Sequence, residues 1–166
     1  MYSSIESFEK DWQYESDSTL KILNVLTAPS LTQRVTSEGR SLGFLAWHLV
    51  LTLGEMGGKA GLDITAPTEG TPVPSSPGTI AEAYDTAAQS LKESLKAKWT
   101  DEMLKGEIEM YGEKWTRAAT LHALVKHEIH HRAQMTVLMR QAGIKVPGIY
   151  GPSREEWSQF GMQAPQ

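Results

Sequence analysis

Apolar residues recur every three to four positions in four long segments of this chain, a spacing typical of amphipathic helices. Ser3 with Glu6, and Thr79 with Glu82, have the spacing of capping boxes at the starts of the first and third segments. The predicted helices run over about 4–26, 41–60, from 79 to beyond 95, and 116–142. The remaining segments lack the apolar–polar alternation of long strands. We therefore predict an all-α fold, a four-helix bundle in a single domain over residues 1–166.

The segments between and after the helices carry weaker signals. A connection at 63–78, rich in Pro and Gly towards its end, is either a surface loop or a lid over an active site. Residues 101–115 are predicted to form a helical turn, an extended piece and a tight turn at Tyr111-Gly112. The tail from residue 149 is predicted to be irregular, with the aromatic residues Tyr150, Trp157 and Phe160 anchoring it to the bundle.

Composition excludes several classes of function. The 166 residues include no cysteine, which removes disulfides, thiolate metal sites and a protein thiol nucleophile. The formal net charge is −4 without a block of basic residues, so a nucleic-acid partner is not expected. Neither a signal peptide nor an apolar run of membrane-spanning length is recognisable. We expect a cytoplasmic protein with a small-molecule substrate and no membrane partner.

Two candidate metal ligands lie in the fourth predicted helix. His127 and His131 are four positions apart and therefore lie on one helical face, where two imidazoles can bind one metal ion. The apolar stripe of this helix is centred on Leu124, and His131 lies within about 20° of that centre and His127 about 60° from it. Both side chains are predicted to point into the bundle, where unsatisfied polar groups are costly.

A third histidine completes a candidate metal site. His48 projects from the apolar face of the second predicted helix, among Phe44, Leu45 and Leu51. His48, His127 and His131 would give a metal three nitrogen ligands and leave positions open, as catalytic sites do. A core His48 bonded to a backbone carbonyl or hydroxyl is the alternative. His122 and His130 are expected at the surface or the boundary.

The residues around His127 and His131 also fit a second hypothesis. His127-Glu128-Ile129-His130-His131 matches the zincin pattern His-Glu-x-x-His, with Glu128 as general base and a downstream carboxylate such as Glu155 as third ligand. The helix is predicted to stop at Gly143, Glu155 lies in an irregular tail, and strands that hold a peptide substrate are absent. A metallopeptidase is therefore the less favoured enzyme.

Two motifs resemble a known family. The DinB/YfiT-like superfamily of helical bundles carries one His in its second helix and a His-x-x-x-His pair in its fourth, often followed by Arg-Gly-Gln. This chain reads LAWHL at 45–49 and HEIHHRAQ at 127–134, with Ala133 in place of the common Gly. The resemblance extends over essentially the whole chain in the order and spacing of its helices.

The resemblance implies a divalent metal held by His48, His127 and His131, and commonly a homodimer. The superfamily includes thiol-dependent transferases and isomerases that use low-molecular-weight bacterial thiols. Because this chain has no cysteine, a thiol route requires an exogenous thiol. Zinc, nickel, iron and copper all accept imidazole ligands, so the metal is left open.

The expected function is metal-assisted nucleophilic chemistry, as a hydrolase or a thiol-dependent transferase. A cation on three neutral imidazoles lowers the pKa of a bound water or stabilises a thiolate. Glu55 and Glu128 are candidate acid/base groups or supports of the ligands, and Arg132 and Gln134 are candidates to orient ligands or substrate. A Glu128–Arg132 ion pair one turn apart is the structural alternative. A non-catalytic bundle that binds a metal or senses a ligand is the alternative function.

Overall fold

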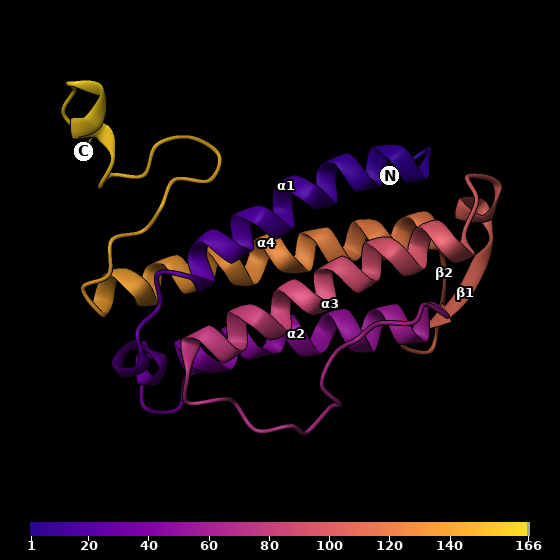
Figure 1. Cartoon of the computed structure of the whole chain (residues 1–166), viewed down its shortest axis with the longest axis horizontal. Helices are drawn as coiled ribbons and strands as arrows, with labels where there is room; N and C mark the ends of the chain where they lie inside the picture. Colours follow the sequence, from indigo (N-terminus) through magenta and orange to yellow (C-terminus); the bar gives the residue numbers. More distant parts are fainter. Residues whose placement is uncertain (166) are drawn as a thin grey trace.

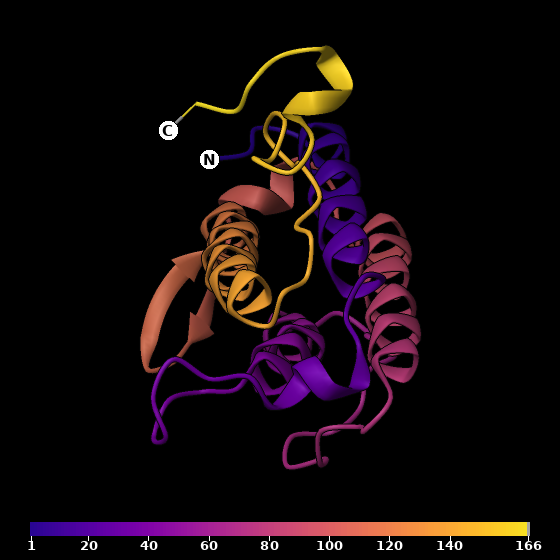
Figure 2. The same cartoon turned by 90° about the vertical axis from the view of Figure 1, so that its left-hand side faces the viewer.

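Four long helices form a bundle in the computed structural model, which describes residues 1–165 (Figure 1). They are α1 (Ile5–Leu23), α2 (Leu42–Lys59), α3 (Pro77–Lys98) and α4 (Arg117–Gln141). Helices α1 and α2 each pack against both α3 and α4, so the order around the bundle is α1, α3, α2, α4 (Figure 2). The predicted four-helix bundle is confirmed. None of these helices, within residues 1–165, has both the length and the apolar character needed to cross a bilayer.

The bundle interior is apolar with a few large aromatic side chains. Phe8, Trp12 and Tyr84 are fully buried there. Burying each such aromatic side chain removes a large apolar area from water, which makes them strong contributors to the core. Residues from all four helices complete the cluster, including Ile22, Leu23, Leu42, Leu49, Leu53, Ile80, Leu91, Leu95, Leu121, Leu124, Met135 and Met139.

Two helix starts differ from the predicted capping boxes. Helix α1 is capped by Ser4, whose Oγ accepts from the Ser7 N–H at 3.1 Å, one residue later than the predicted Ser3–Glu6 pair. Helix α3 starts at Pro77 after the cap Ser76, so it begins earlier than the predicted Thr79. Proline suits a first helical turn because its fixed φ is already helical and its missing N–H would have no helical partner there.

Residues 101–116 form a helical turn and a hairpin. The 3₁₀ helix η2 (Glu102–Lys105) is followed by antiparallel strands β1 (Glu107–Met110) and β2 (Glu113–Thr116). Tyr111 and Gly112 join them with φ values of 54° and 82°, as a two-residue hairpin turn with positive φ at both positions requires. The predicted turn is confirmed. Four-residue strands give too little alternation to be recognised as a pair in the sequence.

The connection between α2 and α3 is fastened across the outer surface of those helices. Trp47 Nε1 donates to the Thr71 carbonyl at 2.8 Å, and the Asp63 N–H donates to Ser94 Oγ at 2.7 Å. On α2, Trp47 lies about 100° round the helix from His48. The connection is therefore a strap on a different face from the histidines, and the lid interpretation of residues 63–78 is not supported.

The C-terminal tail is attached near its start and then projects from the bundle (Figures 1 and 2). Tyr14 donates to the Ile149 carbonyl, and its ring stacks on Tyr150 with centroids 5.9 Å apart. Beyond this point η3 (Trp157–Phe160) contributes no buried residue, and Phe160 is 59% exposed. Tyr150 is thus an anchor, as predicted, whereas the expected anchoring by Phe160 is wrong. Arg140 and Glu155 form an ion pair in this region, with nitrogen and oxygen 3.0 Å apart.

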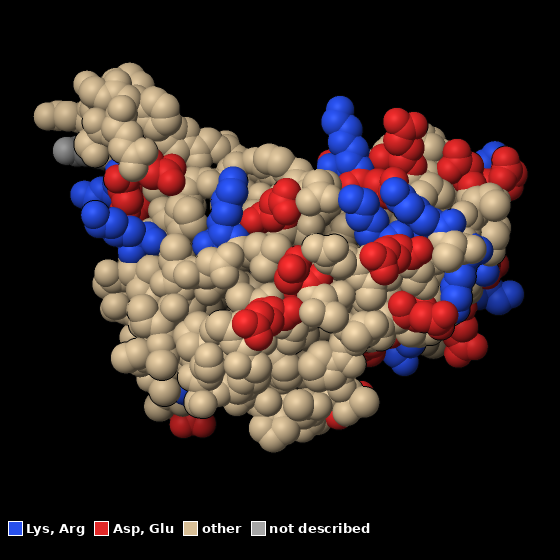
Figure 3. Space-filling model, in the orientation of Figure 1, with Lys and Arg blue, Asp and Glu red and all other residues tan. Residues whose placement is uncertain are grey.

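Charged side chains are distributed unevenly over the face shown in Figure 3. Lysine and arginine are interspersed with aspartate and glutamate towards the upper side and the hairpin end. The lower part, over α2 and the strap that follows it, is largely uncharged. On this face neither sign of charge forms an extended patch of its own.

Candidate metal centre

The structure brings the three predicted ligands together between α2 and α4. The Nε2 atom of His127 lies 3.2 Å from His48 Nε2 and 3.1 Å from His131 Nε2. One ligand nitrogen from each of the three residues lies within 4.8 Å of the others. The reason is the bundle order: α2 is a direct neighbour of α4, and each helix turns its histidine face towards the other.

These separations fit a shared cation. Nitrogens about 2.1 Å from one ion, with ligand angles between octahedral and tetrahedral, lie roughly 3.0–3.4 Å apart. The two Nε2 separations in the structure fall in that range. Without an ion, converging nitrogen lone pairs repel one another. The three-His cluster therefore has the composition and spacing to hold a metal ion.

Gln134 fixes the orientation of one ligand. Its Oε1 lies 2.7 Å from His131 Nδ1 and can only accept, so Nδ1 carries the proton of the neutral ring. The lone pair of His131 is then on Nε2, which faces the cluster. Such support of a ligand imidazole by a neighbouring oxygen is the usual arrangement around protein-bound metals. The prediction that Gln134 orients a ligand thus has a specific contact.

The surroundings keep all three imidazoles neutral. Burial, followed by the neighbouring His131 and His48, lowers the pKa of His127 to about 4. Burial and the nearby His131 lower the pKa of His48, and burial also lowers the pKa of His131 against the opposing effect of Gln134. Neutral imidazoles offer the lone pairs that a metal needs. The Nδ1 atom of His127 is buried without a hydrogen-bond partner among residues 1–165.

A pocket of about 380 Å³ opens beside the cluster. It lies between the loop that precedes α2, the first turn of that helix, and the C-terminal half of α4. Gln134 lines this pocket and also contacts His131, so the pocket adjoins the metal centre, although the three histidines are not among its lining residues. Its lining residues are Val35, Gly39, Arg40, Leu45, Gln134, Val137 and Leu138.

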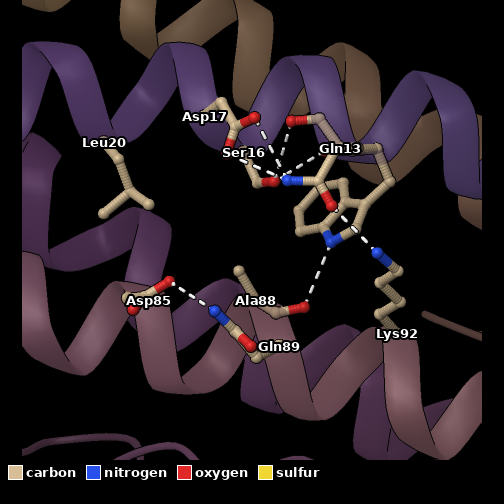
Figure 4. Close-up of a pocket in the computed structure, with 9 residues that line it drawn as sticks. Gln13, Ser16, Asp17, Leu20, Asp85, Ala88, Gln89 and Lys92 are labelled. Atoms are coloured by element: carbon tan, nitrogen blue, oxygen red, sulfur yellow. Dashed lines mark hydrogen bonds between the residues drawn. The ribbon is translucent and has the colours of Figure 1, made fainter.

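A second pocket, between α1 and α3, is unrelated to the cluster (Figure 4). It holds only about 80 Å³, and its polar groups already have partners. Trp12 Nε1 donates to the Ala88 carbonyl at 3.1 Å, and Lys92 Nζ donates to Gln13 Oε1 at 2.9 Å. This pocket therefore offers a ligand little room and few free polar groups.

Glu128 points away from the histidines into the bundle core. Its side chain is 1% exposed, and its carboxylate accepts a hydrogen bond from the Tyr84 hydroxyl of α3. Burial raises the pKa of Glu128 to about 7, while the hydrogen bond from Tyr84 opposes that rise. The zincin hypothesis requires the Glu128 carboxylate beside the metal ligands, whereas here it is buried against Tyr84. The hypothesis also needs Glu155, which instead pairs with Arg140 in the tail.

Arg132 is also buried, at 2% exposed, and belongs to a second polar cluster. It forms an ion pair with Glu15 of α1, and its guanidinium donates to the Tyr150 hydroxyl at 2.7 Å. The predicted Glu128–Arg132 pair is therefore replaced by Arg132–Glu15. The predicted role of Arg132 in orienting ligands or substrate is supported by no contact at the metal centre among residues 1–165.

Glu55 lies two helical turns beyond His48, a rise of roughly 10 Å along α2. It is exposed and neighbours Tyr111, whose pKa is raised to about 12 by burial and then by the charge of Glu55.

His130 is exposed with its ring centroid 4.9 Å from that of His131, and His122 lies near Tyr2. None of these groups joins the three-His cluster.

Comparison with known proteins agrees with this geometry. The sequence model of the DinB family matches residues 1–164. The chain belongs to the DinB family. It is 45% identical to the uncharacterized protein YrdA of Bacillus subtilis strain 168, over 100% of this chain and 99% of that protein.

Solved structures of DinB-like proteins show the same fold. One from Bacillus cereus ATCC 10987 is 41% identical, with a TM-score of 0.87 over 90% of this chain and 100% of that one. YjoA of Bacillus subtilis is 18% identical, with a TM-score of 0.66 over 86% of this chain and 97% of its own. A DinB-family member from Exiguobacterium sibiricum is also 18% identical, with a TM-score of 0.64 over 84% and 91%. The two distant relatives support the DinB fold alone.

Sequence reasoning missed Tyr84 and Glu15 as polar partners of α4, and it missed Arg40 in the pocket lining. Tyr84 is fully buried, and its partner Glu128 lies about 40° from the core centre of α4. A carboxylate at such a position signals a buried hydroxyl or cationic partner, but not which one. Arg40 precedes its helix, where no periodic pattern indicates an environment.

Proposed function

We propose that this DinB-family protein is a divalent-metal-dependent enzyme that activates water or a low-molecular-weight thiol at His48, His127 and His131. The observation that carries the proposal is the convergence of three neutral imidazole nitrogens beside a pocket of about 380 Å³. A purely structural metal is normally enclosed by four protein ligands. Here, among residues 1–165, the group of possible ligands comprises three histidines only.

A divalent cation held there would lower the pKa of a coordinated water or thiol and so supply a nucleophile near neutral pH. The protein's own residues prepare the site. Gln134 sets the tautomer of His131, and Phe44 stacks on His48 at 5.9 Å between ring centroids, which restrains that ring. Leu45 and Leu138 give the adjacent pocket an apolar wall that excludes water from one side of a substrate.

The candidate acid/base residues take different places in the proposal. Glu128 is a positioning residue, because its bond to Tyr84 links α4 to α3 across the bundle core, one residue after His127. Glu55 is exposed and two turns away from His48, so a proton-transfer role for it requires a substrate that extends along α2. The homodimer implied by the family is part of the proposal and is tested by light scattering.

The test begins with metal analysis of untagged protein, because a purification tag and column introduce nickel. We expect one divalent ion per chain in the parent protein, none in His131→Ala, and an unchanged ion content in the matched control His130→Ala. The loaded protein is then assayed with several small thiols and electrophiles, and for hydrolysis. Full metal content in His131→Ala would overturn the three-histidine site, and metal binding without turnover would favour a sensing or binding role.

A further inference from the structure

The pocket beside the metal centre carries one unpaired cation. Arg40 is exposed and, among residues 1–165, forms no ion pair. Its guanidinium carbon lies 5.1 Å from the centre of the Phe44 ring. The other neighbour of that ring is His48, with the two planes only 14° apart. A single aromatic ring therefore separates the guanidinium from a metal ligand.

The loop that carries Arg40 is held in place. The Leu42 N–H donates to the Gln33 carbonyl at 2.9 Å, which closes the loop at its base. The guanidinium of Arg34, the other arginine of the loop, donates a hydrogen bond to the Gly39 carbonyl at 2.6 Å. Arg40 has no such bond to the backbone of residues 1–165. Its positive charge contributes, after burial and the neighbouring histidines, to the lowered pKa of His127.

The rest of the pocket is mainly apolar. Val35 and Val137 flank it and are 65% and 52% exposed, so both offer apolar surface to a molecule in the pocket. Leu45 and Leu138 are buried and complete the wall. The one polar side chain besides Arg40 is Gln134, at the side of the imidazoles. The pocket thus combines a cationic group with an apolar surface, and Gln134 connects it to the metal centre.

We propose, on the basis of the function above, that the substrate or cosubstrate is a small organic carboxylate with an apolar body. Its carboxylate pairs with Arg40, its body covers Val35 and Val137, and its reactive end reaches the three histidines. The planar guanidinium matches a carboxylate with two parallel hydrogen bonds. One arginine without a second cation in the lining suits a singly charged carboxylate better than a doubly charged phosphate. A volume of about 380 Å³ is in the lower range of pockets that hold small organic molecules.

The test uses mercaptohexanoate and mercaptohexanol, which have the same thiol and chain length but differ in the carboxylate. Each is titrated into cobalt-loaded protein, and the cobalt–thiolate absorption reports binding. We expect the acid to bind about tenfold more tightly than the alcohol at low salt. Arg40→Gln should bind both equally. Lys10→Gln, which removes one exposed positive charge from α1, should keep the preference.

A second measurement is independent of the metal. Hexanoate and hexanol are titrated into metal-free protein, and the amide NMR signals of Val137 and Leu138 are followed. We expect shifts at lower concentrations with hexanoate, and this difference should disappear in Arg40→Gln. Equal binding of acid and alcohol to the parent protein, or an unchanged preference in Arg40→Gln, would overturn the inference while leaving the metal centre intact. Tighter binding of hexyl phosphate than of hexanoate would overturn the assignment to a carboxylate. Failure to bind cobalt would instead refute the proposed function and, with it, this inference.

Discussion

Arg132 offers the sharpest test of which polar residues of α4 serve the fold. Its guanidinium is 2% exposed and is bonded to Glu15, which is itself 6% exposed. It also donates to the Glu15 carbonyl at 2.9 Å, to Thr19 Oγ1 at 3.2 Å and to Tyr150 at 2.7 Å. Replacing it with methionine keeps most of the apolar stem and leaves the Glu15 carboxylate buried without its cation.

The expected loss follows from that unpaired charge. Removing one partner of a buried ion pair destabilises a protein by about 3–5 kcal/mol. For a chain of this length each kcal/mol lowers the melting temperature by roughly 2–4 °C, so Arg132→Met should melt roughly 6–20 °C lower. Urea unfolding followed by circular dichroism measures the free energy directly. Because Arg132 is not a ligand in this structure, the folded variant should keep its full metal content.

A double-mutant cycle separates the pair from general damage. Glu15→Gln alone should also destabilise the protein, because it leaves the Arg132 guanidinium buried without a carboxylate. The variant carrying Arg132→Met and Glu15→Gln should lose about 1–3 kcal/mol less than the sum of the two single losses. Strict additivity, or a loss of metal in Arg132→Met at full helicity, would refute a purely structural role for this arginine.

Three further predictions concern the metal centre and its neighbour Glu128. Gln134→Leu should weaken metal binding by roughly 10- to 100-fold, measured by competition with a chelator, because His131 loses the acceptor for its Nδ1 proton. The lowered pKa of His127, about 4 against 6.5 when unfolded, means that the unfolded chain binds more protons between these values. The metal-free protein should therefore lose stability as the pH falls from about 6.5 to about 4, and His127→Gln should flatten that loss in pH-dependent urea unfolding. The pKa of Glu128 is instead raised to about 7 from 4.5, so its contribution is present below pH 4.5 and is lost as the pH rises through 7. Glu128→Gln should accordingly fall less in stability between pH 5 and pH 9 than the parent protein does.

Helical periodicity was sufficient to predict four bundled helices because apolar residues recur at helical spacing along each of them, although α1 and α4 also bury polar side chains such as Glu15 and Arg132. It also placed the three histidines correctly relative to their own helices, since the wheel angle of a residue depends only on its position in the sequence. It did not determine that α2 and α4 are neighbours. The strap between α2 and α3 is long enough for other arrangements, so the convergence of the three histidines was a hypothesis from their helical faces, and the resemblance to the DinB family supported it.

The polar partners of α4 were beyond the same reasoning. Glu128 and Arg132 are four residues apart, so a local ion pair was the natural interpretation. The structure instead pairs each with a residue far away in the chain: Glu128 bonds to Tyr84 of α3, and Arg132 bonds to Glu15 of α1. Arg132 and Glu15 are separated by 117 positions, and no local pattern encodes a contact over that distance.

Helix α4 carries two polar stripes with different roles, which explains why it has so many polar residues. His127 and His131 face α2, whereas Glu128 and Arg132 each follow one of them by one residue and therefore point about 100° further round the helix. One polar stripe can hold a metal, and the other ties α4 to α1 and α3. A substitution in the second stripe is expected to act on stability, and one in the first on metal binding. The His-Glu-x-x-His pattern thus arises here from the adjacency of these two stripes, with a glutamate that serves the bundle and a third histidine supplied by α2.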